Sequence, residues 1–263
     1  MDYEQFKAPV YKLTHVDLDC YKERQMKRRI DALIQKHRLK GYEEFIEAIT
    51  NDKNLFEEFM SYITINVSEF YRNPEQWRIL ESEILPNLIK NAKGKLKVWS
   101  AACSTGDEPY SLAMLIKDYL PTSEFSILAT DLDLQIIEKA KVGVYGEKSL
   151  AGLPKKYKDK YFTKLGEKSY QISDEIKKCV TFQRHDLLKD VYPEPFDLIL
   201  CRNVVIYFTD EAKNRIYTNF NKSLNKNGVL FVGSTEQIIN YRELNYSSIK
   251  SFFYKKNSTE GLS

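Results

Sequence analysis

The stretch Leu96–Tyr110, LKVWSAACSTGDEPY, decides the fold of this chain. It begins with the apolar run LKVWSAA, passes through a loop of small residues and enters a helix near Pro109. In open α/β sheets, ligands bind beyond the carboxyl end of such a strand. Small side chains let a ligand lie against the backbone, and the amides that begin the helix point toward it. Taken alone, the same loop also fits an ordinary tight turn between a strand and a helix.

Downstream of this stretch, apolar runs continue to alternate with helical segments. Helices are predicted from Pro109 to Tyr119, up to Val142 and over 210–224, and further strands at 125–130, 179–182, 196–201 and 228–234. This alternation predicts a mostly parallel sheet covered by helices, which is an open doubly wound α/β fold. Residues 146–178 break the alternation and are too long for an ordinary connection, so we expect an inserted subdomain with a short strand at 170–173.

The residues before Asn73-Pro74 show helical spacing only. Between Tyr21 and Leu39, for example, apolar residues recur at the spacing of one helix face, and Gly41 ends the run. We therefore predict a small all-helical domain over residues 1–72, followed by an α/β domain over 73–263 that carries the insertion 146–178. A helix from Pro74 to about Ile89 should be interrupted or kinked at Pro86.

Composition excludes several classes of protein. The chain has 263 residues, 43% of them hydrophobic, and a formal net charge of +3, so it is long enough and apolar enough to fold around a core. No apolar run approaches the roughly 18 residues that cross a bilayer, and the N-terminus lacks the pattern of a signal peptide. Four cysteines without close pairs and three histidines argue against a zinc site or a disulfide framework. We expect a cytoplasmic monomer that contains no metal and does not insert into membranes.

Polar residues follow the predicted strands, where a ligand would bind. Asp131 ends the second strand and is placed to accept hydrogen bonds from ribose hydroxyls, although it could instead cap the following helix. Asp186 and its neighbours follow the third strand, where a polar side chain could receive the adenine amino group. Because the loop after the first strand lacks the G-x-G-x-x-G fingerprint, a nicotinamide cofactor is disfavoured and S-adenosylmethionine fits better.

Five strings make the family recognisable. The chain resembles the CheR family, the chemotaxis receptor glutamate methyltransferases, in order from the basic helix near Tyr21 to about Tyr254. The strings that carry this resemblance are INVSEFYRN (65–73), WSAACSTGDEPYSLAM (99–114), ATDLD (129–133), CRNVVIYF (201–208) and NGVLFVGSTEQI (227–238).

The resemblance implies a class I S-adenosylmethionine-dependent methyltransferase fold and methyl transfer to receptor glutamates, which gives methyl esters and S-adenosylhomocysteine. It also implies that the cofactor is surrounded by Asn66, Ser68, Arg72, Glu108, Asp131, Asp186, Leu187, Cys201 and Arg202. Arg72 and Tyr207 are expected nearest the transferred methyl group. The family often has asparagine where this chain has Asp186, so the adenine contact should differ there.

The chemistry of Arg72 and Tyr207 suits these roles. A glutamate carboxylate is already ionised at neutral pH, so it needs positioning rather than a general base. Arg72 could hold a carboxylate in a fork of donors, and Tyr207 could fix an oxygen through its hydroxyl. The alternatives are a surface arginine after Phe70-Tyr71 and a core aromatic in the run VVIYF.

A basic segment indicates the partner. Residues 22–40 contain eight lysines and arginines against two acidic residues, and Arg24, Arg28 and Arg38 should lie opposite the buried face formed by Met26, Ile30, Leu33 and His37. Such a surface suits the glutamate-bearing cytoplasmic helices of chemotaxis receptors, although a solvated helix face is the simpler reading.

Two rival functions are disfavoured. A nucleic-acid methyltransferase is disfavoured because the N-P-P-Y and Pro-Cys motifs are missing, and a catalytically silent cofactor-binding adaptor is disfavoured because Arg72 and Tyr207 are present. We therefore expect no nucleic-acid partner.

Overall fold

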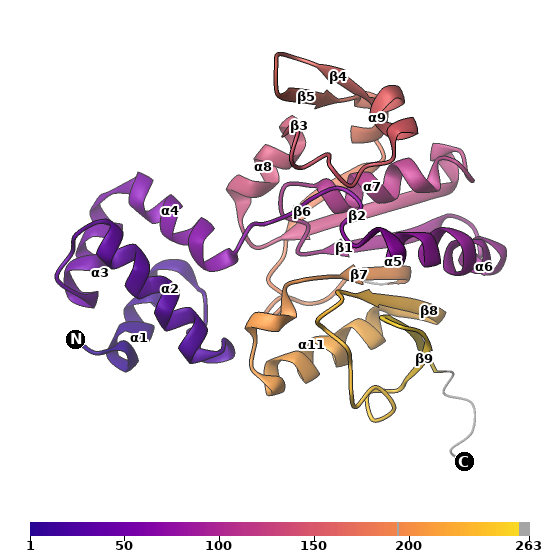
Figure 1. Ribbon diagram of the computed structural model, residues 1–263. Helices are drawn as coiled ribbons and strands as arrows, with labels where there is room; N and C mark the ends of the chain where they lie inside the picture. Colours follow the sequence, from indigo (N-terminus) through magenta and orange to yellow (C-terminus); the bar gives the residue numbers. More distant parts are fainter. Residues whose placement is uncertain (194, 258–263) are drawn as a thin grey trace. The chain divides into compact units, whose positions relative to one another are not determined.

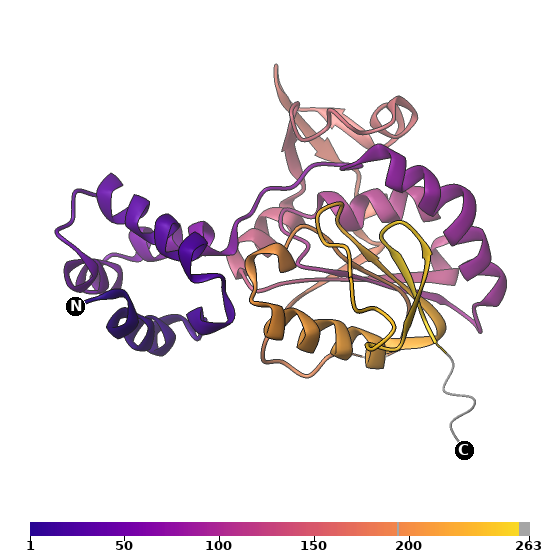
Figure 2. The same ribbon diagram turned by 60° about the horizontal axis from the view of Figure 1, so that its bottom comes forward.

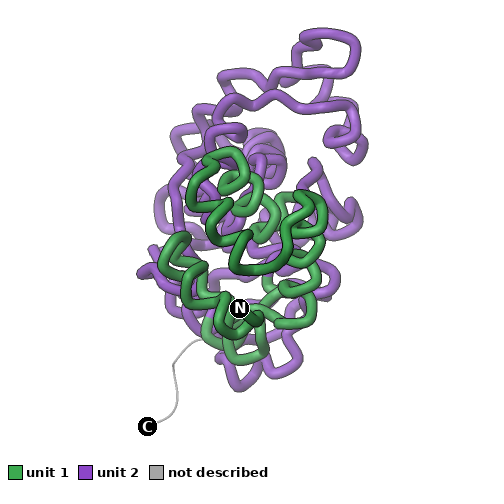
Figure 3. Tube along the Cα trace, turned by 90° about the vertical axis from the view of Figure 1, so that its left-hand side faces the viewer, with its two compact units in different colours: residues 1–66, 205–215 green, residues 67–204, 216–263 purple. Residues whose placement is uncertain are grey.

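The computed structural model describes residues 1–193 and 195–257 and divides the chain into two compact units. The first unit contains Met1–Asn66 together with Val205–Arg215, and the second contains Val67–Val204 together with Ile216–Ser263 (Figure 3). Residues 205–215 thus belong to the unit that is otherwise built from the start of the chain. The proposed break at residue 72 stays a prediction.

The first unit is helical, as predicted (Figure 1). Its helices are α1 (Tyr3–Thr14), the 3₁₀ turn η1 (Leu18–Cys20), α2 (Glu23–Lys36), α3 (Tyr42–Asn51) and α4 (Lys53–Thr64). It also includes the 3₁₀ turn η4 (Val205–Tyr207) and the first residues of α11 (Asp210–Ser223). Aromatic rings form much of its core, since Phe45 packs against Phe6 and Phe59 with ring centroids 6.1 and 5.3 Å away.

Helix α2 is shorter than the sequence predicts, and this corrects the placement of Arg38. The helix ends at Lys36, and Arg38 adopts a left-handed conformation with φ of 56°. The amide of Arg38 donates to the carbonyl of Gln35, and that of Leu39 donates to Ile34, which together form a Schellman motif. Arg38 is exposed but lies beyond the helix, so it does not share a helix face with Arg24 and Arg28.

The second unit contains a seven-stranded sheet with the order β6-β2-β1-β7-β8-β10-β9. Its strands are β1 (Leu96–Ala101), β2 (Phe125–Asp131), β6 (Val180–Arg184), β7 (Phe196–Cys201), β8 (Leu224–Val232), β9 (Tyr246–Lys250) and β10 (Phe253–Lys256). The five strands from β6 to β8 run parallel, whereas β10 is antiparallel to both of its neighbours. The predicted doubly wound α/β fold is confirmed. Strands β9 and β10, which complete one edge of the sheet, were not predicted from the sequence.

Helices cover both faces of this sheet (Figures 1 and 2). Adjacent residues of a strand point to opposite faces. On β1, Val98 therefore joins a core cluster with residues of α7 (Asp107–Ile116), while Trp99 packs against Phe220 of α11 at a ring distance of 5.3 Å. Helix α8 (Leu134–Val142) packs on β2 and β6. Burial on both faces explains why these strands read as continuous apolar runs.

The predicted interruption near Pro86 is present as a π-helical turn. Helix α5 (Pro74–Ile79) continues into the π turn η2 (Leu80–Ile84) and then into α6 (Leu85–Asn91). Proline lacks an amide hydrogen, and its ring collides with the carbonyl four residues earlier. A wider turn just before the proline accommodates both effects, so the helix continues past Pro86.

The insertion forms a separate three-stranded sheet with the order β3-β5-β4. Its strands are β3 (Val144–Gly146), β4 (Phe162–Lys164) and β5 (Ser169–Ile172), and its helices are α9 (Lys155–Tyr161) and α10 (Asp174–Lys177). The strand predicted at 170–173 corresponds to β5. A further 3₁₀ turn, η3 (Thr122–Glu124), precedes β2.

Candidate functional site

The loop after β1 is shaped by residues with positive φ. Ala102, Ser104 and Gly106 have φ of 61°, 48° and 87°. A side chain at Gly106 would lie 3.0 Å from Cβ of Ala140, so the loop could not pass so close to α8 with a larger residue there. The amide of Ser104 donates to Oδ2 of Asp131 at 2.8 Å, which joins this loop to the end of β2.

Asp131 is buried at the junction of β1 and β2, with 7% of its surface exposed. Its Oδ1 accepts the amide of Asp133 at 3.1 Å, and burial raises the pKa of its carboxyl to about 6. The alternative role as a helix cap is filled by another residue, because Asp133 accepts the amides of Gln135 and Ile136 and caps α8. The Oγ atom of Ser104 is buried nearby without a hydrogen-bond partner among the described residues.

The segment after β6 is also buried and internally bonded. Oδ1 of Asp186 accepts the amide of Leu188 at 2.8 Å, and the carbonyl of Leu187 accepts the hydroxyl of Tyr192 at 2.7 Å. The amide of His185 donates to the Asp131 carbonyl at 2.9 Å. Burial lowers the pKa of His185, so its ring is neutral at pH 7, and its Nε2 has no partner in the part of the chain that the structure describes.

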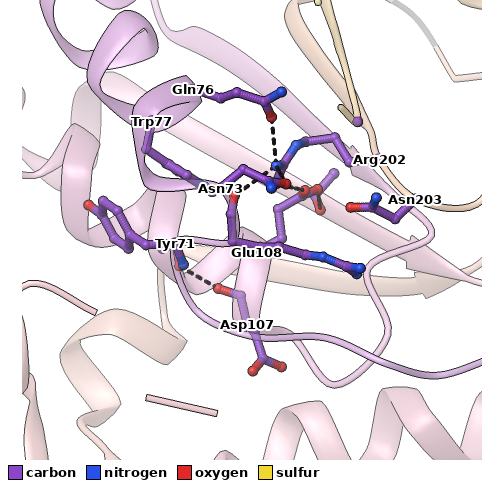
Figure 4. Close-up of polar contacts among 12 residues, drawn as sticks. Tyr71, Asn73, Gln76, Trp77, Asp107, Glu108, Arg202 and Asn203 are labelled. Carbon is purple, nitrogen blue, oxygen red and sulfur yellow. Dashed lines mark hydrogen bonds and ion pairs between the residues drawn. The ribbon is translucent and has the colours of Figure 1, made fainter. Parts of the chain in front are cut away.

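A buried ion pair lies between β7 and α7 (Figure 4). Nη1 of Arg202 lies 3.4 Å from Oε2 of Glu108, and Oε1 of Glu108 accepts the hydroxyl of Ser100 at 2.8 Å. Burial raises the pKa of Glu108 and lowers that of Arg202, while the charge of each partner opposes the shift of the other. The side chain of Arg202 is only 2% exposed. Its charge therefore interacts with groups of the protein rather than with solvent.

Arg202 also holds the segment that carries Arg72. Its Nη2 donates to the carbonyl of Arg72 at 2.8 Å and to Oε1 of Gln76 at 2.9 Å. The side chain of Arg72 itself is partly exposed, and its Nη1 lies 3.3 Å from the carbonyl of Val67. The structure thus brings together Arg72, Glu108 and Arg202, three of the residues expected around the cofactor.

Ser68 reaches the same region through the buried carboxylate of Asp107. This carboxylate accepts hydrogen bonds from the hydroxyls of Ser68, Thr105 and Ser149. It therefore ties the chain near Ser68 to the loop after β1 and to the insertion. Burial raises the pKa of the Asp107 carboxyl, and the three hydroxyls oppose that shift.

Cys201 behaves as a packing residue. Its side chain is fully buried at the end of β7, and burial raises the pKa of its thiol well above the ordinary value. A thiol of this kind is not a nucleophile at neutral pH. Any contact of Cys201 with a cofactor would therefore come through its backbone or its surface.

Asn66, Tyr207 and the three arginines belong to the first unit. Asn66 donates through Nδ2 to the hydroxyl of Thr64 at 3.0 Å. Tyr207 is partly exposed, and its carbonyl accepts the amide of Lys22 at 2.8 Å.

On helix α2, Arg24 and Arg28 are exposed, as predicted. The inward-facing role expected for His37 is only partly met, because its ring is half-buried with Nε2 3.0 Å from Oε2 of Glu58.

Several residues of this region were not predicted from the sequence. Gln76 and Trp77 were assigned only to a helix, yet both contact groups around Arg72. Glu236 lies in the string NGVLFVGSTEQI and accepts the amides of Asn203 and Gly233. A side chain at Gly233 would come within 2.9 Å of the backbone nitrogen of Asn203, so glycine is needed there. Glu236 lies in a recognised string, whereas Gln76 and Trp77 lie outside the five strings, and no spacing rule indicates the partner of any of the three.

Within residues 1–193 and 195–257, no helix is long and apolar enough to cross a membrane. The same residues contain no group of three histidine, cysteine, aspartate or glutamate side chains that could hold a metal ion.

Comparison with known proteins gives matches over nearly the whole chain. The family model described as CheR methyltransferase, all-alpha domain, matches residues 1–64, and that described as CheR methyltransferase, SAM binding domain, matches residues 66–253. A chemotaxis protein methyltransferase of Listeria monocytogenes is 45% identical over 255 residues, which cover 97% of each chain. That of Listeria innocua is 44% identical over the same length and coverage. That of Borreliella burgdorferi is 33% identical over 261 residues, covering 94% of this chain and 91% of the relative.

Proposed function

Because the chain belongs to the CheR family of S-adenosylmethionine-dependent chemotaxis methyltransferases, we propose that it methylates glutamate side chains of chemotaxis receptors. The products are glutamate methyl esters and S-adenosylhomocysteine. Two parts of the site support this proposal: a buried acidic pocket suited to a nucleoside, and an arginine with donors left for a carboxylate.

The nucleoside would be held at the carboxyl ends of β1, β2 and β6. Each oxygen of Asp131 accepts one backbone amide, and each can accept a further hydrogen bond from a ribose hydroxyl. Two buried polar atoms, Oγ of Ser104 and Nε2 of His185, have no partner within the described residues and so suit a bound polar ligand. Asp186 and Leu187 would lie toward the adenine.

When bound, S-adenosylmethionine supplies a methyl group on a positively charged sulfur. The receptor carboxylate is ionised at neutral pH, so no side chain has to remove a proton. The protein must instead align the carboxylate and keep water away from it. The partly exposed guanidinium of Arg72 suits this task, and we assign to the Tyr207 hydroxyl the task of fixing an oxygen of the reacting groups. The proposal rests chiefly on this partly exposed guanidinium of Arg72.

The receptor would be recognised by the first unit. Arg24 and Arg28 are exposed on α2, and Arg38 is exposed just beyond its end. Opposite charge on a glutamate-bearing helix would speed encounter and favour one orientation.

The nature of the methylated group tests this function directly. Purified protein is incubated with methyl-tritiated cofactor and membranes that contain the cognate receptors. We expect label in the receptor band that mild alkali releases as volatile methanol, because esters hydrolyse and methylated amines do not. Label that survives alkali, or label in added RNA, would contradict carboxyl methylation.

A further inference from the structure

The backbone at Arg72 is strained. Tyr71 and Asn73, its two neighbours, have φ of 54° and 61°. Residues other than glycine seldom adopt positive φ, and for a bulky aromatic residue it is a genuine outlier. Such conformations persist where the surroundings force them, and they concentrate at functional sites.

Two buried side chains hold the carbonyl of Arg72. The indole Nε1 of Trp77 donates to it at 3.1 Å, and Nη2 of Arg202 donates at 2.8 Å. A carbonyl oxygen has two lone pairs, so both of its acceptor positions are in use. Trp77 is 2% exposed and so is the side chain of Arg202, which places both donors away from competing water.

Arg202 is a costly group for this purpose. Its Nη2 carries two hydrogens but lies within hydrogen-bond distance of three acceptors. These are the carbonyl of Arg72, Oε1 of Gln76 and, at 3.2 Å, Oδ1 of Asn73. The guanidinium also lies over the ring of Phe231, 4.7 Å from its centroid. A buried charge destabilises the fold unless it is paired, and the pairing here requires Glu108. Figure 4 shows Asn73, Gln76 and Glu108 gathered around Arg202.

The side chain of Arg72 is held far less firmly than its backbone. Its one hydrogen bond within the described residues is the 3.3 Å contact with Val67, and no acidic side chain there pairs with it. A fixed backbone with an unpaired guanidinium is the arrangement expected of a group that must meet an external carboxylate in one place.

We propose that Trp77 and Arg202 are positioning residues that set where the Arg72 guanidinium lies during methyl transfer. This inference rests on the proposed function, in which Arg72 acts beside the transferred methyl group. It assigns Arg202 a task different from direct contact with the cofactor, and it gives Trp77 a task beyond packing.

The chain offers a matched pair of variants to test this. Trp77→Phe keeps an aromatic ring and removes the indole donor to Arg72. Trp99→Phe makes the same change at the only other tryptophan, whose Nε1 donates to the hydroxyl of Thr130 at 2.9 Å. One such hydrogen bond corresponds to about a three- to tenfold effect. We expect kcat/KM for receptor methylation to fall by that factor in Trp77→Phe and to stay within about twofold of wild type in Trp99→Phe.

A double-mutant cycle separates positioning from a general structural effect. If Trp77 acts through Arg72, then Trp77→Phe should cause no further loss in an Arg72→Ala background. Arg202→Lys, which keeps the charge but cannot reach several acceptors at once, should lower kcat/KM more than Trp77→Phe.

Three outcomes bear on the inference. Equal activity of the two tryptophan variants, or an equal loss from Trp77→Phe with and without Arg72, would overturn it while leaving the proposed function intact. If Arg72→Ala abolishes measurable activity, the comparison of the two tryptophan variants decides. A wild-type protein that forms no alkali-labile ester would instead refute the proposed function, and the inference would fall with it.

Discussion

At the scale of single residues, burial determines how Asp131 behaves. The carboxyl lies between the loop after β1 and the end of β2, and burial raises its pKa to about 6 even though two backbone amides stabilise the ionised form. A carboxylate with this pKa changes charge near the lower end of the physiological range. Its protonation state should therefore control how well it accepts hydrogen bonds from a ligand.

This predicts a pH dependence of cofactor affinity. Above pH 6 Asp131 is ionised and both oxygens accept hydrogen bonds; below pH 6 it is protonated and one oxygen becomes a donor. Affinity should be nearly constant above pH 7 and should fall by up to about tenfold per pH unit below pH 6. Calorimetric titration from pH 5 to 8 measures this. Asp131→Asn should bind weakly at every pH, and a wild-type affinity that does not change with pH would contradict the role of Asp131.

At the scale of elements, the end of α2 decides which arginines share a surface. The Schellman motif at Arg38 stops the helix, so Arg24 and Arg28 remain as the exposed arginines expected opposite its buried face. Neighbouring charges on one helix act together on an acidic partner, and they are screened by salt over about 8–10 Å at physiological ionic strength.

Reversal of these two charges should weaken receptor binding. In Arg24→Glu/Arg28→Glu we expect KM for receptor to rise at least severalfold, with cofactor affinity unchanged, because the new carboxylates repel a glutamate-bearing helix. The wild-type rate should decline as salt rises, and the variant should lose most of that dependence. Lys93→Glu/Lys95→Glu, exposed residues before β1, gives the same change in net charge as a control. Equal effects of the two double variants would point to net charge alone.

The strands and helices also show which parts of the structure could be predicted from the sequence. The parallel strands and their helices were predictable because burial on both faces gives unbroken apolar runs. Strand β9 was missed because Ser247, Ser248 and Lys250 give an exposed edge strand the composition of a loop. Candidate site residues could be named from the five strings, and their roles stay predictions. The bond from Trp77 to Arg72 could not be predicted, since it depends on positive φ angles at both Tyr71 and Asn73, and an aromatic residue such as Tyr71 gives no indication of a positive φ.

At the scale of the whole molecule, Val205–Arg215 belongs to a compact unit whose other part is Met1–Asn66. The amide of Lys22 donates to the carbonyl of Tyr207, and that of Thr209 donates to Cys20 at 2.9 Å. The rings of Tyr21 and Phe208 meet at 4.9 Å. The first unit therefore fixes the backbone of Tyr207, a residue that we assign to catalysis.

Loss of the Phe208 ring should consequently affect stability and turnover together. Phe208→Ala removes a buried ring that packs on Tyr21, so the free energy of unfolding should fall by about 3–5 kcal/mol. Turnover, measured at a temperature where circular dichroism shows the variant folded, should fall as well. Phe45→Ala removes a fully buried ring elsewhere in the same unit and should destabilise without that loss of turnover. If both variants keep full turnover while folded, the attachment of Tyr207 to the first unit has no catalytic role.

The two tryptophans give the chain an optical property that follows from their positions. Trp99 is fully buried against the sheet. The indole of Trp77 donates a hydrogen bond to the carbonyl of Arg72, and the guanidinium carbon of Arg202 lies 6.0 Å from the centroid of the Trp77 ring. Indole emission responds to nearby charge. With Trp99 replaced by phenylalanine, the tryptophan fluorescence of the protein, excited at a wavelength that its 18 tyrosines do not absorb, would come from a single residue at the Arg72 turn. Arrival of the cofactor or a receptor glutamate could then be followed in real time without an added label.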